Sequence, residues 1–149
     1  AVTPVIRYAE VLLSYLECLI ESGQAIDPTV LNLTINQVRG RADVKMPPVT
    51  ETNSDKLREL LRNERRVELA FEGIRYWDLL RWKLAETVLV GEVWGAPYPK
   101  SITYAGSTKF VDPTGHCRWY VGRRDFRNPQ DYKWPIPLSE QNINPNLRE

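Results

Sequence analysis

Hydrophobic positions recur at helical spacing near the start of the chain. The segment from Val5 to Ser22 places apolar side chains three and four residues apart, which is the period of an α-helix with one buried face. Gly23 follows and is a natural C-terminal stop. The stripe that we expect to be buried consists of Val5, Ala9, Leu12, Leu13, Leu16, Leu19 and Ile20. Tyr8 and Tyr15 flank this stripe, and we expect them to serve helix packing rather than ligand binding.

A second pattern follows Asp27 and Pro28, a pair typical of a helix start with an N-cap and proline at the first helical position. Apolar and polar residues alternate over 31–36, which fits a strand, but the same segment also fits a helix that continues to Ala42. The capping pair favours the helix.

The next helix is expected to run to Glu72, after a Thr52-to-Asp55 pattern that resembles a capping box. Its apolar stripe consists of Leu57, Leu60, Leu61, Val67 and Phe71. Gly73 breaks the pattern, and a further helix is expected from Arg75 to about Leu89. The side chains expected to point inward there are Trp77, Leu80 and Leu84.

Two acidic side chains lie on the otherwise apolar stripe before Gly73. Glu64 and Glu68 are at i, i+4 spacing, so they share one face, and carboxylates there repel each other unless cations hold them. The cations near them in sequence are Arg65, Arg66 and Arg75, whose planar guanidinium groups can hold a carboxylate through two hydrogen bonds. One interpretation makes the acids a general acid/base pair. We favour salt bridges that fix how two helices dock, because arginine neighbours stabilise the charged carboxylate, whereas a general acid must carry a proton before it can donate one.

From Gly91 onward, glycines and prolines punctuate segments that are too short for helices. Short strands at 108–111 and 118–121 are expected to form a hairpin. The tail through Trp134 and Ile136 is expected to be extended, with both side chains as anchors. The sequence therefore predicts a mainly α fold, with a helical scaffold over residues 1–90 and an irregular, loop-rich lobe with short strands over 91–149 packed on it.

Composition excludes several classes of function. A net charge of +1 gives no electrostatic reason to expect nucleic-acid binding. No apolar run reaches the roughly 18 residues of a membrane-spanning helix, and no secretory signal peptide opens the chain. Cys18 is expected to be a small buried hydrophobe, and the sequence does not decide whether it pairs with Cys117. His116 is the one histidine, so we expect no metal site and no cofactor.

Three ordered motifs resemble the SusD/RagB family of outer-membrane nutrient-binding lipoproteins. They are VIRYAEVLLSYLEC with the later INQVRGRA, then NERRVELAFEGIRYWDLLRW, and finally YKWPIPLSEQNINPNL. Together they span nearly the whole chain. The resemblance implies tetratricopeptide-like helix pairs, which the residues alone do not demonstrate.

The resemblance also implies a function. Family members bind glycans, or in some cases peptides, at the cell surface and deliver them without chemistry to a SusC-like, TonB-dependent transporter of the outer membrane. They are several times longer than this chain and begin with a lipoprotein signal and a lipidated cysteine, so we expect a C-terminal fragment whose membrane attachment lies in a lipid anchor that it lacks.

Candidate ligand-binding residues come from the chemistry of sugars rather than from the motifs. One face of a sugar ring is apolar and packs on aromatic side chains, so aromatics on loops are the candidates. They are Trp94, Tyr98, Tyr104 and Trp119, with Tyr120 as a further possibility. The alternative for each is that it seals a loop onto the helices.

Two rival functions are weighed against glycan binding. One is a helical protein-interaction scaffold without a small ligand, which would have an apolar groove between helix pairs and buried loop aromatics. The other is a glycoside hydrolase that uses Glu64 and Glu68, which would need free carboxylates facing a cleft. We expect no enzyme, because the sequence has no nucleophile–histidine constellation, metal site or phosphate loop.

Overall fold

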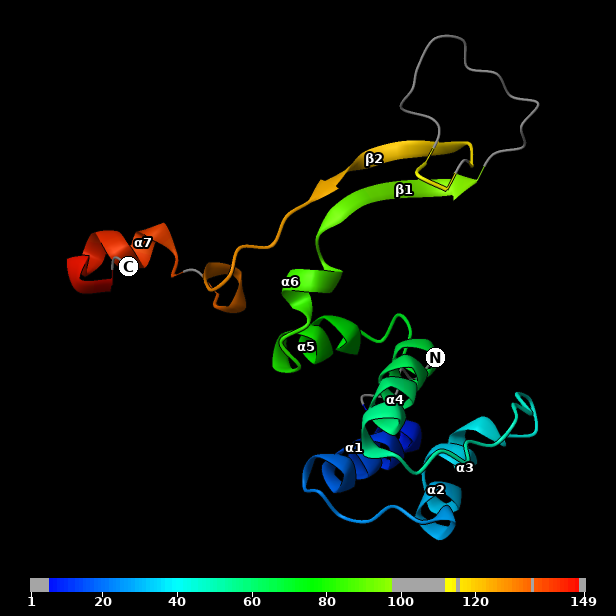
Figure 1. The fold of residues 1–149 in the computed structure, drawn as a ribbon. Coiled ribbons are helices and arrows are strands. Elements are labelled where there is room, and N and C mark those ends of the chain that lie inside the picture. Colours follow the sequence, from blue (N-terminus) through cyan, green and yellow to red (C-terminus); the bar gives the residue numbers. More distant parts are fainter. Residues whose placement is uncertain (1–5, 98–111, 115, 135, 148–149) are drawn as a thin grey trace, which may run out of the picture. The chain divides into compact units, whose positions relative to one another are not determined.

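The computed structural model describes residues 6–97, 112–114, 116–134 and 136–147 (Figure 1). The chain divides into two compact units, Ala1–Trp77 and Asp78–Glu149. The elements are mostly helices with one small two-stranded sheet, which confirms the mainly α prediction. The boundary expected at residue 90 and the packing of the second lobe stay predictions. No helix of the described residues is long and apolar enough to cross a bilayer.

The first unit is built around α1 (Tyr8–Glu21), as its apolar period predicted. Figure 1 shows α1 beside α3 (Ile35–Arg39) and α4 (Ser54–Glu68), and it contacts both. The core of the unit consists of Leu12, Leu13, Leu16, Ile20, Ile26, Leu31, Ile35, Val38, Val49, Leu57 and Leu61. Burial of α1 thus follows the expected stripe, except that Val5 lies outside the described residues and Cys18 is exposed rather than buried.

The helical interpretation of the ambiguous second segment is correct. Asp27 accepts a hydrogen bond from Val30 N at 2.9 Å and so caps α2 (Pro28–Leu33). The chain bends at Thr34, and α3 follows. The Asn36 side chain then holds the returning backbone at Val49, since it accepts from Val49 N at 2.7 Å and donates to Val49 O at 3.0 Å.

The long helix α4 differs from the prediction at both ends. Its N-cap is Asn53, which accepts from Lys56 N at 3.1 Å, rather than Thr52. It stops at Glu68 with Leu69 as its C-cap, and Phe71 and Gly73 then take left-handed φ values of +64° and +78°.

The buried face of α4 also differs from the predicted stripe. Leu57 and Leu61 are buried as expected, and the same face continues to Arg65. Leu60, Val67 and Phe71 are exposed, in contrast to the predicted stripe. The buried residues of α4 are therefore spaced four positions apart, whereas the predicted stripe had mixed spacings.

The second unit begins in α5 (Ile74–Arg81), followed by α6 (Ala85–Val88). The single helix predicted over this region is broken because Lys83 takes a positive φ of +56°. Leu79 is buried in place of Trp77, which is exposed, and Leu80 and Leu84 are half-buried.

The hairpin pairs β1 (Gly91–Pro97) antiparallel to β2 (Arg118–Arg124). The predicted strand at 118–121 lies in β2, and its partner is β1, which the sequence pattern does not predict to be a strand. The expected partner at 108–111 lies outside the described residues. Gly91 pairs with Arg124 and Trp94 with Tyr120.

The described residues after Pro129 form three short helical segments: η2 (Gln130–Tyr132), α7 (Leu138–Ile143) and η3 (Pro145–Leu147). α7 and η3 contact each other. Trp134 is 75% exposed, so it does not serve as the buried anchor that the sequence predicted, whereas Ile136 is half-buried.

Candidate functional site

The carboxylates of Glu64 and Glu68 on α4 are held by guanidinium groups from other elements. Glu64 accepts a hydrogen bond from Arg39 at the end of α3. Glu68 Oε1 accepts from Arg7 at 2.9 Å and from Arg41 at 2.8 Å, and its Oε2 accepts from Arg41 at 3.0 Å. Arg41 thus makes a two-bond fork, the strong geometry for this pair. Only 12% of the Glu64 side chain and 10% of the Glu68 side chain are exposed.

These partners differ from the arginines named from the sequence. Arg65 is buried and faces α1, where it donates to Ser14 Oγ at 3.0 Å and lies 3.9 Å from a carboxylate oxygen of Glu17. Arg66 is exposed and bonds within its own helix, and Arg75 is half-buried on α5. The sequence interpretation chose cations close in the chain, whereas the three that hold the α4 acids are 25 to 61 residues away from them.

Arg7 joins the residue before α1 to the end of α4. It donates to the backbone carbonyl of Glu68 at 2.6 Å and lies 2.7 Å from a carboxylate oxygen of Glu72. The pKa of Arg7 is raised, chiefly by its hydrogen bond to Glu72 and further by Glu68, although burial acts in the opposite direction. The arrangement suits pins that fix helix docking, because both α4 acids are ion-paired rather than open to a ligand.

The hairpin places two of the predicted ligand-binding aromatics. Trp94 on β1 is half-buried and meets Tyr120 on β2 edge-to-face, with ring centroids 5.2 Å apart and planes at 69°. Trp119 is 49% exposed and alternates with Tyr120 along β2, so the two side chains lie on opposite faces. Tyr98 and Tyr104 lie outside the described residues.

A buried carboxylate fixes the chain just before β2. Asp112 Oδ1 accepts from the Thr114 hydroxyl at 2.7 Å and from the backbone N–H groups of Thr114 and His116, each at 2.9 Å. Arg118 Nε lies 2.9 Å from the other oxygen. The Thr114 hydroxyl, these N–H groups and Arg118 lower the pKa of Asp112, so it stays charged at neutral pH. This turn positions the strand that carries Trp119.

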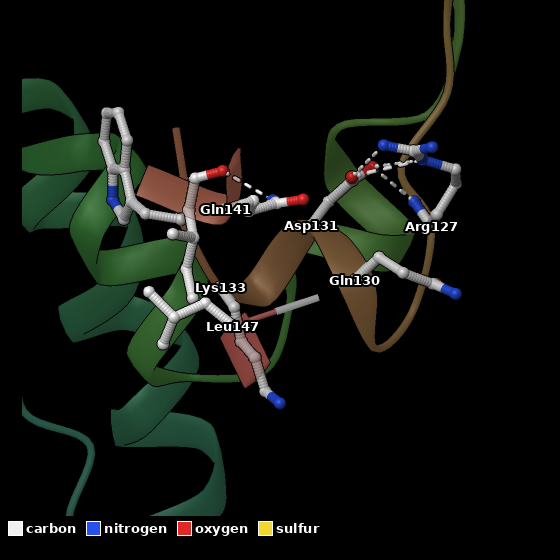
Figure 2. Close-up of a pocket in the computed structure, with 8 residues that line it drawn as sticks. Arg127, Gln130, Asp131, Lys133, Gln141 and Leu147 are labelled. Carbon is white, nitrogen blue, oxygen red and sulfur yellow. Dashed lines mark hydrogen bonds and ion pairs between the residues drawn. The ribbon is translucent and has the colours of Figure 1, made fainter. Parts of the chain in front are cut away.

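A second candidate site is a pocket of about 260 Å³ near the end of the chain, which we call the C-terminal pocket (Figure 2). It lies within the second unit. Its polar lining residues are Arg127, Gln130, Asp131, Lys133 and Gln141. Its apolar lining residues are Trp134, Ile136 and Leu147.

The polar groups of this pocket are held in place by short-range bonds. Figure 2 shows the side chains of Arg127 and Asp131 facing each other, with Arg127 Nη2 donating to Asp131 Oδ1 at 2.8 Å and Arg127 N to Oδ2 at 2.7 Å. The guanidinium group and then the backbone N–H of Arg127 lower the pKa of Asp131, and Asp131 in turn raises the pKa of Arg127. Gln141 donates to the Ile136 carbonyl at 2.8 Å.

Such a lining suits a ligand with an apolar face and a polar rim. An indole and two aliphatic side chains can contact the face of a sugar ring, while the carboxylate, guanidinium and amide groups can bond its hydroxyls. The described residues contain no group of three or more His, Cys, Asp or Glu side chains that could hold a metal ion. Both cysteines are free thiols in the structure.

The sequence interpretation missed the C-terminal pocket. The local signal for it is the i, i+4 spacing of Arg127 and Asp131, which lie close in the chain to the aromatic residue Trp134. The two prolines that follow that tryptophan, Pro135 and Pro137, predict an extended segment and an anchor rather than the rim of a pocket.

Known proteins resemble this chain along its whole length. The sequence model of the SusD family matches residues 1–149. A solved SusD-like carbohydrate binding protein from Bacteroides fragilis is 68% identical, with a TM-score of 0.91 over 98% of this chain and 28% of that one. A second SusD-like structure from Bacteroides fragilis is 32% identical, with a TM-score of 0.65 over 93% of this chain and 24% of that one.

Curated relatives agree with the solved structures. SusD-like protein P38 of Formosa agariphila is 37% identical over 90 residues, which are 56% of this chain and 17% of that protein. SusD-like protein P2 of the same organism is 38% identical over 88 residues, which are 55% of this chain and 17% of that protein. The chain therefore spans less than a third of the length of each of these relatives.

Proposed function

The chain belongs to the SusD family, and on that premise we propose that it is part of a protein that binds glycans without changing them chemically. The observation that carries this proposal is the 68% identity, along 98% of the chain, to a SusD-like carbohydrate binding protein. Because the chain spans 28% of that protein, the proposal concerns a part of the binding protein rather than a complete one.

The proposed binding mechanism uses aromatic faces and hydrogen bonds. We assign the ligand contacts to the face of the hairpin that carries Trp119, with Tyr98 and Tyr104 on the segment that joins its strands as further candidates. Trp94 lies with Tyr120 on the opposite face and would contact a ligand bound there. Support comes from Trp119, which is 49% exposed on a strand positioned by the Asp112 turn. The C-terminal pocket is the second place in the chain where a sugar ring fits chemically.

The same proposal includes what happens to the bound glycan. The protein would lie at the outer surface of the outer membrane, held by a lipid anchor, and would pass its ligand to a SusC-like, TonB-dependent transporter. Support for these steps is family membership alone. Catalysis is no part of the proposal, and the ion-paired state of Glu64 and Glu68 supports that view.

The rival scaffold function has less support. It requires loop aromatics that are buried, and Trp119 is exposed. The relatives that match the chain also include a carbohydrate binding protein. We therefore keep glycan binding as the proposal.

Glycan binding can be measured by tryptophan fluorescence and calorimetry with a panel of soluble oligosaccharides. We expect at least one glycan class to change the emission of the wild-type chain. Trp119→Ala should weaken that binding about tenfold, since an aromatic contact contributes roughly 1 kcal/mol beyond its buried area. Trp134→Ala is the matched control, because it removes an exposed indole from the other candidate site.

Each outcome has a definite meaning. A loss with Trp119→Ala and none with Trp134→Ala supports the hairpin, and the reverse places the site in the C-terminal pocket. A wild-type chain that binds no member of a broad panel contradicts glycan binding by these 149 residues.

A further inference from the structure

A β-bulge interrupts the hairpin beside the exposed Trp119. Between its last two paired positions, β1 has two residues, Gly95 and Ala96, where β2 has one, Trp119. A bulge brings an extra residue into one strand and changes the direction of nearby side chains, and bulges are common next to functional sites. The two residues of β1 that face Trp119 therefore decide what surrounds its indole.

The backbone at Gly95 does not require a glycine. Gly91, at the start of the same strand, has a φ of +104°, which a residue with a Cβ atom rarely adopts, whereas Gly95 has no positive φ. A Cβ atom built on Gly95 would lie 3.5 Å from its nearest neighbour, Trp119 O, which is ordinary van der Waals contact. Glycine inside a strand also weakens a sheet, because it has no side chain to pack. Contacts among the described residues thus leave this glycine without a structural reason.

A side chain at position 95 would lie against the indole of Trp119. The Cβ position of Gly95 is 3.6 Å from Trp119 Cβ, closer than the roughly 4.5–5.5 Å between directly opposed Cβ atoms in a regular antiparallel pair. Two Cβ positions this close place both side chains on the same face of the hairpin. Trp119 is 49% exposed on that face, and Val121, two residues further along β2, is 63% exposed. Because Gly95 has no side chain, residue 95 does not cover the indole.

Two roles for this glycine can be compared. Glycine inside a strand often marks a place where a ligand approaches closely, and a sugar ring that stacks on an indole needs such an approach. Alternatively, the indole could fill the space above the glycine and stabilise the hairpin, as aromatic residues do when they cover a glycine across a sheet. The two roles predict opposite effects of a larger residue on stability.

We propose that Gly95 determines ligand access to Trp119, because it keeps the β1 side of the indole clear for a sugar ring. This inference rests on the proposed function, in which Trp119 contacts the glycan. Gly95 contributes space rather than a contact. A branched side chain at this position would occupy the volume that the sugar ring takes.

The first experiment measures the binding of maltohexaose, cellohexaose, xylohexaose and mannohexaose by calorimetry. For each one that the wild-type chain binds, we expect Gly95→Val to weaken binding about tenfold, as Trp119→Ala does, because both remove the same stacking surface. Gly95→Ala adds a single carbon and should weaken binding less. In the Trp119→Ala background, Gly95→Val should change the affinity by less than about twofold, because the indole that it would cover is already gone.

The second experiment measures stability without a ligand. Valine favours strands and pairs well with an aromatic residue across a hairpin, so Gly95→Val and Gly95→Ala should leave the urea midpoint unchanged or raise it. A loss of affinity without a loss of stability supports a role in ligand access. A midpoint that both variants lower overturns the proposal, because the glycine is then needed for the fold of the hairpin.

The third experiment measures how accessible the indole is in the absence of glycan. The contribution of Trp119 to acrylamide quenching is the difference between a chain and the same chain with Trp119→Phe. We expect Gly95→Val to reduce this contribution, because the valine side chain covers part of the ring. Unchanged quenching overturns the proposal.

Failure of this inference can be distinguished from failure of the proposed function. If the wild-type chain binds a hexasaccharide through Trp119 and Gly95→Val binds it equally well, the role of Gly95 alone is overturned. Independent, additive losses from Gly95→Val and Trp119→Ala also overturn it. A wild-type chain that binds none of these glycans contradicts the proposed function, and the role of Gly95 is contradicted with it.

Discussion

Arg65 and Arg66 are neighbours in the chain and differ in every physical respect that matters for stability. Arg65 is 4% exposed and faces Ser14 and Glu17 on α1, and Glu17 is itself 8% exposed. Arg66 is exposed on the other side of the same helix. Removal of a buried cation leaves a buried carboxylate without compensation, whereas removal of an exposed cation does not.

We expect Arg65→Met to lower the free energy of unfolding by about 3 kcal/mol, the scale of a broken buried ion pair. Arg66→Met makes the same substitution at an exposed position and should lower the free energy of unfolding by less than about 0.5 kcal/mol. Urea unfolding followed by circular dichroism measures both. Similar losses for the two variants would show that the buried pair is not a stabilising contact.

Removal of Glu68 on α4 is expected to lower the free energy of unfolding by less than removal of Arg65. Glu68 is largely buried, but Arg7 and Arg41 are 27% and 38% exposed and can regain water when it is removed. We therefore expect Glu68→Ala to cost roughly 1–2 kcal/mol, between the values for exposed and buried pairs. Glu59→Ala, at an exposed position of the same helix, is the control and should be near neutral. The prediction fails if the two losses are equal.

At the scale of elements, local signals predict local structure well. The apolar period of α1 and the Asp27 cap of α2 act within one or two turns, and the structure has both. The end of α4 is mispredicted because a positive φ at Phe71 is favoured by no side-chain property of phenylalanine. β1 is missed because its Gly and Pro residues are typical of chain breaks, and its pairing with β2 joins residues 21 to 33 positions apart. The arginines that hold Glu64 and Glu68 are likewise 25 to 61 residues away in the chain, so no local pattern identifies them.

The C-terminal pocket contributes a pH dependence whose sign follows from Asp131. Its folded-state pKa is lowered by Arg127, below the unfolded value of about 3.9. The ion pair therefore stabilises the fold above that pH, and its contribution is lost as pH falls through the lowered pKa. Asp131→Asn should be less stable than wild type at pH 7, and the difference should vanish toward about pH 2.

Urea unfolding at several pH values, followed by tryptophan fluorescence, measures this difference. Asp125→Asn is the control, because Asp125 is an exposed acid in the same segment. A difference between wild type and Asp131→Asn that persists unchanged in acid would rule out the ion pair as its source.

At the scale of the whole molecule, the first unit buries more side chains than the described part of the second unit does. The first contains the main apolar core, while the described residues of the second bury chiefly Leu79, Ala85, Asp78 and Asp112. Four of the five tryptophans also belong to the second unit, and Trp77 alone belongs to the first. Fluorescence and helical circular dichroism therefore report on different parts of the chain.

We expect the two signals to give separate unfolding transitions, which is the usual sign of departure from two-state behaviour. In Trp77→Phe, where fluorescence reports on the second unit alone, the fluorescence midpoint should lie at a lower urea concentration than the circular dichroism midpoint. Superimposable curves would mean that the units unfold as one.

The bond pair between Asn36 and Val49 has a practical consequence. It closes the base of the segment after α3, and inside it Met46 N donates to Arg39 O at 2.9 Å. A loop fastened at its base tolerates added length at its tip. A short epitope tag inserted between Ala42 and Asp43, which are exposed, would let an antibody detect the folded chain without disturbing the core beneath it.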